Sequence, residues 1–141
     1  MRTYWDTSAA INAAVSPVVA ARLDQGEHIT RLHLLEEFFS TMTGRGVVGR
    51  DADGDPVRVL FRPADCVTWL RDFCSQVAFV ELTPEELLAG LEKAQGLSVQ
   101  GARVYDFSHA LAALKGQAEE LATRNTGHFE GLVGKTKLVW P

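Results

Sequence analysis

The stretch Arg2-Thr3-Tyr4-Trp5-Asp6-Thr7-Ser8-Ala9-Ala10 decides the fold. Its first four residues are β-prone, and three helix N-cap formers in a row then precede an alanine-rich segment. This order predicts a short strand that turns directly into a helix. Asp6 stands at the strand end, where a buried acid is costly unless it binds a cation or receives hydrogen bonds. A simple N-cap role also fits, although Thr7 or Ser8 could provide that cap as well.

The same alternation continues along the chain. We predict further strands at residues 27–30, 77–82, 120–124 and 136–140, and further helices at residues 17–25, 32–44, 63–76, 85–95 and 103–115. Such alternation implies a three-layer α/β/α fold with a mostly parallel central sheet and helices on both faces. Ligands of these sheets bind beyond the carboxyl ends of the strands. Asp6 and Asn125 both follow strands directly, so we expect them in one crevice.

Residues 46–62 interrupt this pattern. Two valine-rich runs flank Asp53-Gly54, which is a strong hairpin signal, and we predict a β-hairpin excursion on the surface. The sequence Asp51-Ala52-Asp53-Gly54-Asp55 resembles the start of a calcium loop. However, proline stands at the sixth position and arginine at the twelfth, so we interpret the segment as a turn.

Composition is typical of one globular domain spanning residues 1–141. The net charge of −4 would repel a polyanion, so any nucleic-acid contact must be local. Cys66 and Cys74 form no CxxC pair, which favours a reduced, cytoplasmic protein. The apolar run at residues 8–21 is interrupted by Asn12 and Pro17, and no window is long enough for a membrane span.

Three further segments place acids or polar groups beside predicted elements. In Leu34-Leu35-Glu36-Glu37-Phe38-Phe39 two glutamates lie about 100° apart on a helix, and periodicity does not choose which one faces the core edge. Asp106 falls in the first turn of a helix, where it also complements the helix dipole. The segment at residues 123–129 (TRNTGHF) is a polar strand end that also fits a simple turn.

Together these segments resemble the PIN-domain nuclease family, and specifically the VapC-type toxins of type II toxin–antitoxin pairs. YWDTSAAI is similar to the first motif of the family, LLEEFF to its leucine-rich acidic motif, VYDFSHALAA to the third and TRNTGHF to the fourth. The motifs occur in the family order and span nearly the whole chain.

The resemblance implies a site and a reaction. By motif, the second acid is Glu37 rather than Glu36, and Asp6, Glu37 and Asp106 are the metal ligands. Asn125, the fourth catalytic residue, stands where the family often has an acid. Such oxygen ligands suit Mg²⁺ or Mn²⁺, which would stabilise charge at the scissile phosphate and activate water. The implied activity is a metal-dependent endoribonuclease acting on single-stranded RNA.

The resemblance also suggests contacts and partners. We expect RNA-contacting roles for side chains near the acids: Thr7, Ser8, Arg103, Arg124 and His128, with Arg31 and Arg45 as further steering charges. His109, one turn beyond Asp106, is expected to be structural on the same helix face. The implied partners are a small cognate antitoxin and a second copy of the chain in a homodimer.

Two other functions remain open. A PIN domain that has lost turnover and acts as an RNA- or protein-binding module is the main alternative, because Asn125 replaces an acid. A small phosphate-ester hydrolase would instead use Asp6 as a nucleophile and form an aspartyl-phosphate.

Overall fold

A computed structural model describes all residues from 1 to 141 and contains a five-stranded parallel sheet at its centre. The strands are ordered β5-β2-β1-β6-β7, with every neighbouring pair parallel. Their bounds are β1 Arg2–Trp5, β2 Glu27–Thr30, β5 Ala78–Phe79, β6 Glu120–Ala122 and β7 Lys137–Val139. The strand from the start of the chain therefore lies between β2 and a strand formed near its end.

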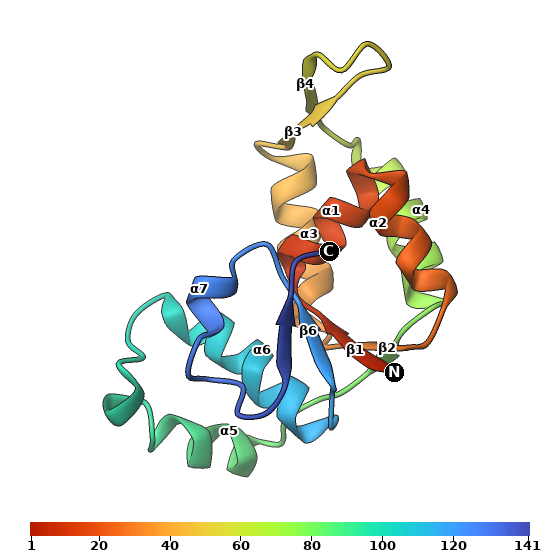
Figure 1. Cartoon of the computed structure of the whole chain (residues 1–141). Coiled ribbons are helices and arrows are strands. Elements are labelled where there is room, and N and C mark those ends of the chain that lie inside the picture. Colours follow the sequence, from red (N-terminus) through yellow and green to blue (C-terminus); the bar gives the residue numbers. More distant parts are fainter.

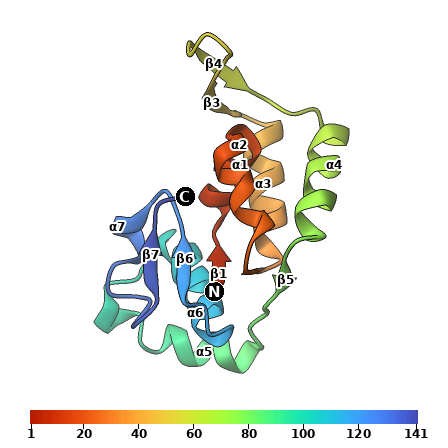
Figure 2. The ribbon, with the colours of Figure 1, turned by 45° about the vertical axis from the view of Figure 1, so that its right-hand side comes forward.

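Helices cover both faces of this sheet (Figures 1 and 2). One face carries α1 Thr7–Val15, α2 Pro17–Ala20, α3 His33–Thr43 and α4 Pro63–Cys74. The other carries α5 Pro84–Leu91, α6 Arg103–Lys115 and α7 Thr126–Phe129. Short 3₁₀ turns follow α2 at Ala21–Asp24 and α5 at Gln95–Leu97. The predicted three-layer α/β/α fold is confirmed.

The core is divided by the sheet because successive strand residues point to opposite faces. Trp5 packs with Phe38 and Phe73 in the cluster under α1, α3 and α4. Its neighbour Tyr4 packs with Phe107 in the cluster under α6. Both β1 aromatic side chains are fully buried, so the opening strand contributes to both halves of the core.

Helix starts follow the signals in the sequence. Asp6 caps α1 by accepting the Ala9 amide, and Ser16 caps α2 ahead of Pro17. Thr83 and Glu86 form a capping box at the start of α5. Each cap satisfies amides that the first helical turn leaves without partners.

The hairpin consists of β3 Val47–Arg50 and β4 Pro56–Val59, which pair antiparallel as a separate two-stranded sheet. It projects from the body beyond α3 in both ribbon views (Figures 1 and 2). Gly46 enters it with φ +66°, and a Cβ there would lie 2.3 Å from the Val59 carbonyl oxygen. Only glycine fits this close approach. The predicted hairpin and its turn are confirmed.

Some predicted helices are shorter in the structure: the helix predicted at residues 85–95 ends at Leu91, and the one predicted at residues 17–25 consists of α2 and a 3₁₀ turn. Two further differences have a clear physical cause. Strand β5 has two residues rather than the six predicted at 77–82, because it is an edge strand that leaves the sheet after Val80 donates its amide to the Thr30 carbonyl. The segment after β6 forms the short helix α7, which the sequence suggested only as a turn. Phe129 is fully buried there, so core packing supports the added helical turn. No helix is both long and apolar enough to cross a bilayer.

Candidate active site

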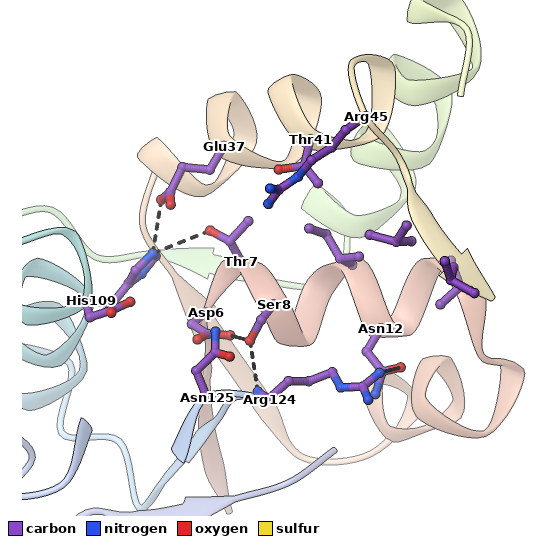
Figure 3. Close-up of a pocket in the computed structure, with 15 residues that line it drawn as sticks. Asp6, Thr7, Ser8, Asn12, Glu37, Thr41, Arg45, His109, Arg124 and Asn125 are labelled. Atoms are coloured by element: carbon purple, nitrogen blue, oxygen red, sulfur yellow. Dashed lines mark hydrogen bonds and ion pairs between the residues drawn. The ribbon is translucent and has the colours of Figure 1, made fainter. Parts of the chain in front are cut away.

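A pocket of about 310 Å³ opens beyond the carboxyl ends of β1 and β6. Side chains from α1, α3, α6 and the segment after β6 converge on it (Figure 3). The lining includes the predicted catalytic set and much of its surroundings: Asp6, Thr7, Ser8, Ile11, Asn12, Val15, Glu37, Thr41, Arg45, Val47, Val48, Asp106, His109, Arg124 and Asn125. Residues more than 110 positions apart in the chain therefore share one cavity.

Asp6 lies at the floor of the pocket and is almost completely buried. Its Oδ1 accepts hydrogen bonds from the Ser8 hydroxyl at 2.7 Å and the Ala9 amide at 2.9 Å, and its Oδ2 accepts one from the Thr123 hydroxyl at 2.5 Å. Burial nevertheless raises the pKa of Asp6, because these bonds only partly offset the cost of a charge removed from water. Asp6 is thus both the helix cap and a buried carboxylate that forms no salt bridge with a basic side chain.

Glu37, rather than Glu36, faces the pocket from α3. Its Oε1 lies 3.1 Å from Nε2 of His109 and 3.8 Å from Nε2 of His33. Burial acts to raise the pKa of Glu37, but the hydrogen bond and charge of His109, assisted by His33, outweigh it and hold the pKa below its usual value. The lowered pKa keeps Glu37 negatively charged where it lines the pocket.

Asp106 projects from the first turn of α6 and Asn125 from the start of α7. Oδ2 of Asp106 lies 3.1 Å from Nδ1 of His128. The side chain of Asn125 makes no capping hydrogen bond to α7, while its backbone N–H donates to the Thr123 hydroxyl at 2.9 Å. The amide side chain that stands in the place of a fourth acid is therefore free of a helix-capping role.

Two arginines line the pocket, Arg45 beside Thr41 on the α3 side and Arg124 beside Asn12 on the other side of α1 (Figure 3). Arg124 donates to Oδ1 of Asn12 at 3.1 Å, and its guanidinium lies 4.5 Å from the centre of the exposed Trp140 ring. Arg45 reaches the pocket from beyond the end of α3. These two cations lie beside the acids of the pocket, in a molecule whose net charge is −4.

The predicted RNA-contacting residues divide into two groups. Thr7, Ser8 and Arg124 line the pocket. Arg103 and His128 do not: Arg103 donates to the Ser98 carbonyl, and His128 is paired with Asp106 at the rim. Arg31 is also outside the pocket lining, although Arg45 belongs to it.

A second acidic group lies on the hairpin. The carboxylate oxygens of Asp51, Asp53 and Asp55 can all lie within 4.8 Å of one another, and all three residues are exposed. Oδ1 of Asp51 accepts the amides of Asp53 and Asp55, so this carboxylate already organises the turn. The pocket acids do not reach that mutual proximity.

The pocket donors fit a hard divalent cation. Oε2 of Glu37 and Oδ1 of Asp106 accept no hydrogen bond from the protein, and the buried charge of Asp6 would be compensated by a cation. Mg²⁺ and Mn²⁺ prefer such oxygen ligands and keep several waters, which suits carboxylates that are near one another without being in contact.

Chains from two solved structures match this fold over 99% of its length. One is VapBC2 from Rickettsia felis bound to a DNA fragment from their promoter, with 12% identity, 98% of that chain covered and a TM-score of 0.67. The other is VapBC-1 from nontypeable Haemophilus influenzae, with 16% identity, 98% coverage and a TM-score of 0.66. The chain has a PIN fold. No protein-family model and no curated protein matches it in sequence.

Sequence reasoning did not find two contributors to this PIN-fold pocket. Thr123 is fully buried and hydrogen-bonds to Asp6, but nothing in a polar strand end distinguishes it from a turn residue. His109 was expected only to share a face with Asp106. In the structure it contacts Glu37, 72 residues away, which helical spacing could not predict.

Proposed function

We propose that this protein is a metal-dependent endoribonuclease of the VapC type, the toxin of a toxin–antitoxin pair. The observation that carries the proposal is the convergence of Asp6, Glu37 and Asp106 from β1, α3 and α6 on one pocket. The likeness to chains of two VapBC structures supports the same conclusion. Asp6, Glu37 and Asp106 would hold Mg²⁺ or Mn²⁺.

A bound ion would stabilise the charge that develops on the scissile phosphate and activate the attacking water. The protein itself would contribute position and charge. Ser8 and Thr123 hold the Asp6 carboxylate in place, and Arg124 and Arg45 would contact phosphates of a single RNA strand entering the pocket. Asn125 would orient substrate or water with an uncharged side chain.

The proposed VapC-type function also implies partners. A small antitoxin would block the acidic pocket with a basic side chain, and the catalytic form would be a homodimer. The Rickettsia felis structure contains a fragment of promoter DNA, whereas the nucleic acid proposed for this chain is RNA.

The test is cleavage of a labelled single-stranded RNA by the purified protein. We expect products only with Mg²⁺ or Mn²⁺, their loss on addition of EDTA, and their loss in Asp106→Asn and Glu37→Gln. Glu36→Gln is the matched control, since the neighbouring carboxylate is exposed and outside the pocket. Equal cleavage by all variants would show that a contaminating nuclease, or a different site, is responsible.

A binding module without turnover is the second candidate. Two features favour a binding module. The pocket acids lie farther apart than the hairpin acids, and Asn125 carries no charge, so both features weaken a metal centre made of several carboxylates. Tight RNA binding by the wild-type protein, with no cleavage in any divalent cation, would support this function instead. A trapped aspartyl-phosphate on Asp6 would point to a phosphate-ester hydrolase.

A further inference from the structure

The imidazole of His109 is buried between the sheet and the pocket, with only 2% of the residue exposed. It contacts side chains from three other elements. Nδ1 lies 2.7 Å from the Tyr4 hydroxyl of β1, and Nε2 lies 3.1 Å from Oε1 of Glu37 on α3 and 3.5 Å from the Thr7 hydroxyl on α1. Figure 3 shows the ring of His109 facing both Glu37 and Thr7.

The partners fix which nitrogen carries the proton. An ionised carboxylate can only accept, so Nε2 must carry the hydrogen that is shared with Glu37. In the neutral ring Nδ1 then has no hydrogen and accepts from the Tyr4 hydroxyl. Burial raises the pKa of Tyr4, so this hydroxyl keeps its proton and remains a donor. Tyr4, His109 and Glu37 thus form a chain of hydrogen bonds from the core to the pocket, and Nε2 of His109 donates to Glu37 in both the neutral and the charged form of the ring.

This chain occupies only one oxygen of the glutamate. Oε1 accepts from His109 at 3.1 Å, whereas no hydrogen bond within 3.5 Å ends at Oε2, and the nearby Thr7 hydroxyl contributes more weakly to lowering the pKa of this carboxylate. A carboxylate held by one oxygen loses rotational freedom and presents the other in a fixed direction. Hydrogen bonds of this kind to a metal-binding carboxylate contribute to affinity for the ion.

We propose that His109 is a positioning residue that, oriented by Tyr4, holds Glu37 so that its free oxygen is presented to the divalent cation. The inference rests on the proposed metal-dependent function. It assigns His109 an effect on metal affinity that is separate from any contribution to packing.

The structure supplies a matched control in a second buried imidazole. His28 on β2 also contacts a β1 aromatic residue edge-on: its ring centroid lies 5.8 Å from that of Trp5, against 5.7 Å for Tyr4 and His109. Its Nδ1 accepts from the Trp5 indole at 3.0 Å, and its Nε2 lies 2.8 Å from the Gln25 carbonyl oxygen. His28 does not line the pocket that holds Glu37.

The experiment compares His109→Asn with His109→Gln. The two amides have the same chemistry, but only the longer one can place an N–H near the position of Nε2. Binding of Mn²⁺ to the RNA-free protein is measured by electron paramagnetic resonance, and thermal unfolding is measured without metal. We expect His109→Asn to weaken Mn²⁺ binding by about 10-fold to 100-fold and His109→Gln to remain within about threefold of wild type.

Tyr4→Phe keeps the ring and removes only the hydroxyl, so we expect it to weaken Mn²⁺ binding severalfold. His28→Asn and His28→Gln should lower the unfolding temperature and leave Mn²⁺ affinity unchanged. Equal losses in His109→Asn and His109→Gln, or no loss in either, would overturn the proposal. Should neither amide variant fold, unchanged affinity in Tyr4→Phe would overturn it. If the wild-type protein itself binds no Mn²⁺, the proposed metal-dependent function fails first.

Discussion

The pocket acids and the hairpin acids carry the same functional group in opposite surroundings. On the hairpin, Asp51, Asp53 and Asp55 are close together and exposed to water. In the pocket, Asp6 is buried, Glu37 and Asp106 are partly shielded, and each has a named hydrogen-bond partner. Water already stabilises exposed carboxylates, whereas a buried one gains more from a cation. Closeness of acids alone is therefore a weak criterion for a metal site.

The largest effect that would separate the two groups is expected from Asp6→Asn. Asparagine is as good an N-cap as aspartate, so α1 should keep its start while the pocket loses its most buried charge. We expect RNA cleavage to fall by at least about a hundredfold, equivalent to about 2.7 kcal/mol of barrier. Circular dichroism should be unchanged. Retention of wild-type cleavage by a folded Asp6→Asn protein would contradict the pocket assignment.

Arg124 offers a smaller and more specific change. Replacing it by glutamine removes one cation from the pocket, and we expect KM for RNA to rise by roughly tenfold, or about 1.4 kcal/mol. The dependence of binding on salt concentration should also become shallower, because one phosphate contact is lost. Arg103→Gln is the control, since this arginine lies outside the pocket lining. An equal effect of both substitutions would indicate general rather than pocket-specific charge.

The raised pKa of Asp6 predicts that Asp6→Asn also changes the free energy of unfolding, by less than the substitutions above change RNA cleavage and binding. An acid whose pKa is raised by folding stabilises the protein at pH values below its unfolded pKa, and this contribution is lost as the pH rises through the folded value. At neutral pH without metal, Asp6→Asn should therefore be more stable than wild type by on the order of 1 kcal/mol.

Urea unfolding at several pH values checks this sign. The advantage of Asp6→Asn should shrink as the pH falls through the raised pKa of Asp6 toward its ordinary value of 3.8. Mn²⁺ should stabilise the wild-type protein and not the variant, because an ion that binds only the folded state favours folding. If the stability advantage of Asp6→Asn over wild type grew as the pH fell, burial of the Asp6 charge could not be the cause of the raised pKa.

The smallest effect is expected on the hairpin. The triple substitution of Asp51, Asp53 and Asp55 by asparagine keeps acceptors for the turn and removes three negative charges. We expect Mn²⁺ affinity and RNA cleavage within about twofold of wild type and a stability change within about 0.5 kcal/mol. If this triple variant lost metal binding while Asp6→Asn kept it, the metal site would be on the hairpin rather than in the pocket.

Much of the fold could be predicted because its signals are local. The strand ending at Asp6, the capping box at Thr83 and the Asp53-Gly54 turn each depend on a few adjacent residues, and all three form as expected. The short helix α7 was missed because burial of Phe129, a tertiary effect, determines it. The early end of β5 likewise depends on its position at the sheet edge.

The site was less accessible to sequence reasoning. Periodicity could not choose between Glu36 and Glu37, and only the motif resemblance favoured the residue that lines the pocket. The contacts of Asp6 with Thr123 and of Glu37 with His109 join residues 117 and 72 positions apart. No spacing rule covers such distances. The metal role of these acids remains a prediction.

The central position of β1 has a consequence for the order in which the protein matures. Strand β1 is synthesised well before one of its two neighbours, β6, which begins at Glu120. A growing chain that ends before β6 therefore lacks Thr123 and Arg124, and Asp6 cannot acquire its final surroundings until β6 has been made. The proposed activity would accordingly depend on the synthesis of β6, long after Asp6 itself has been added to the chain.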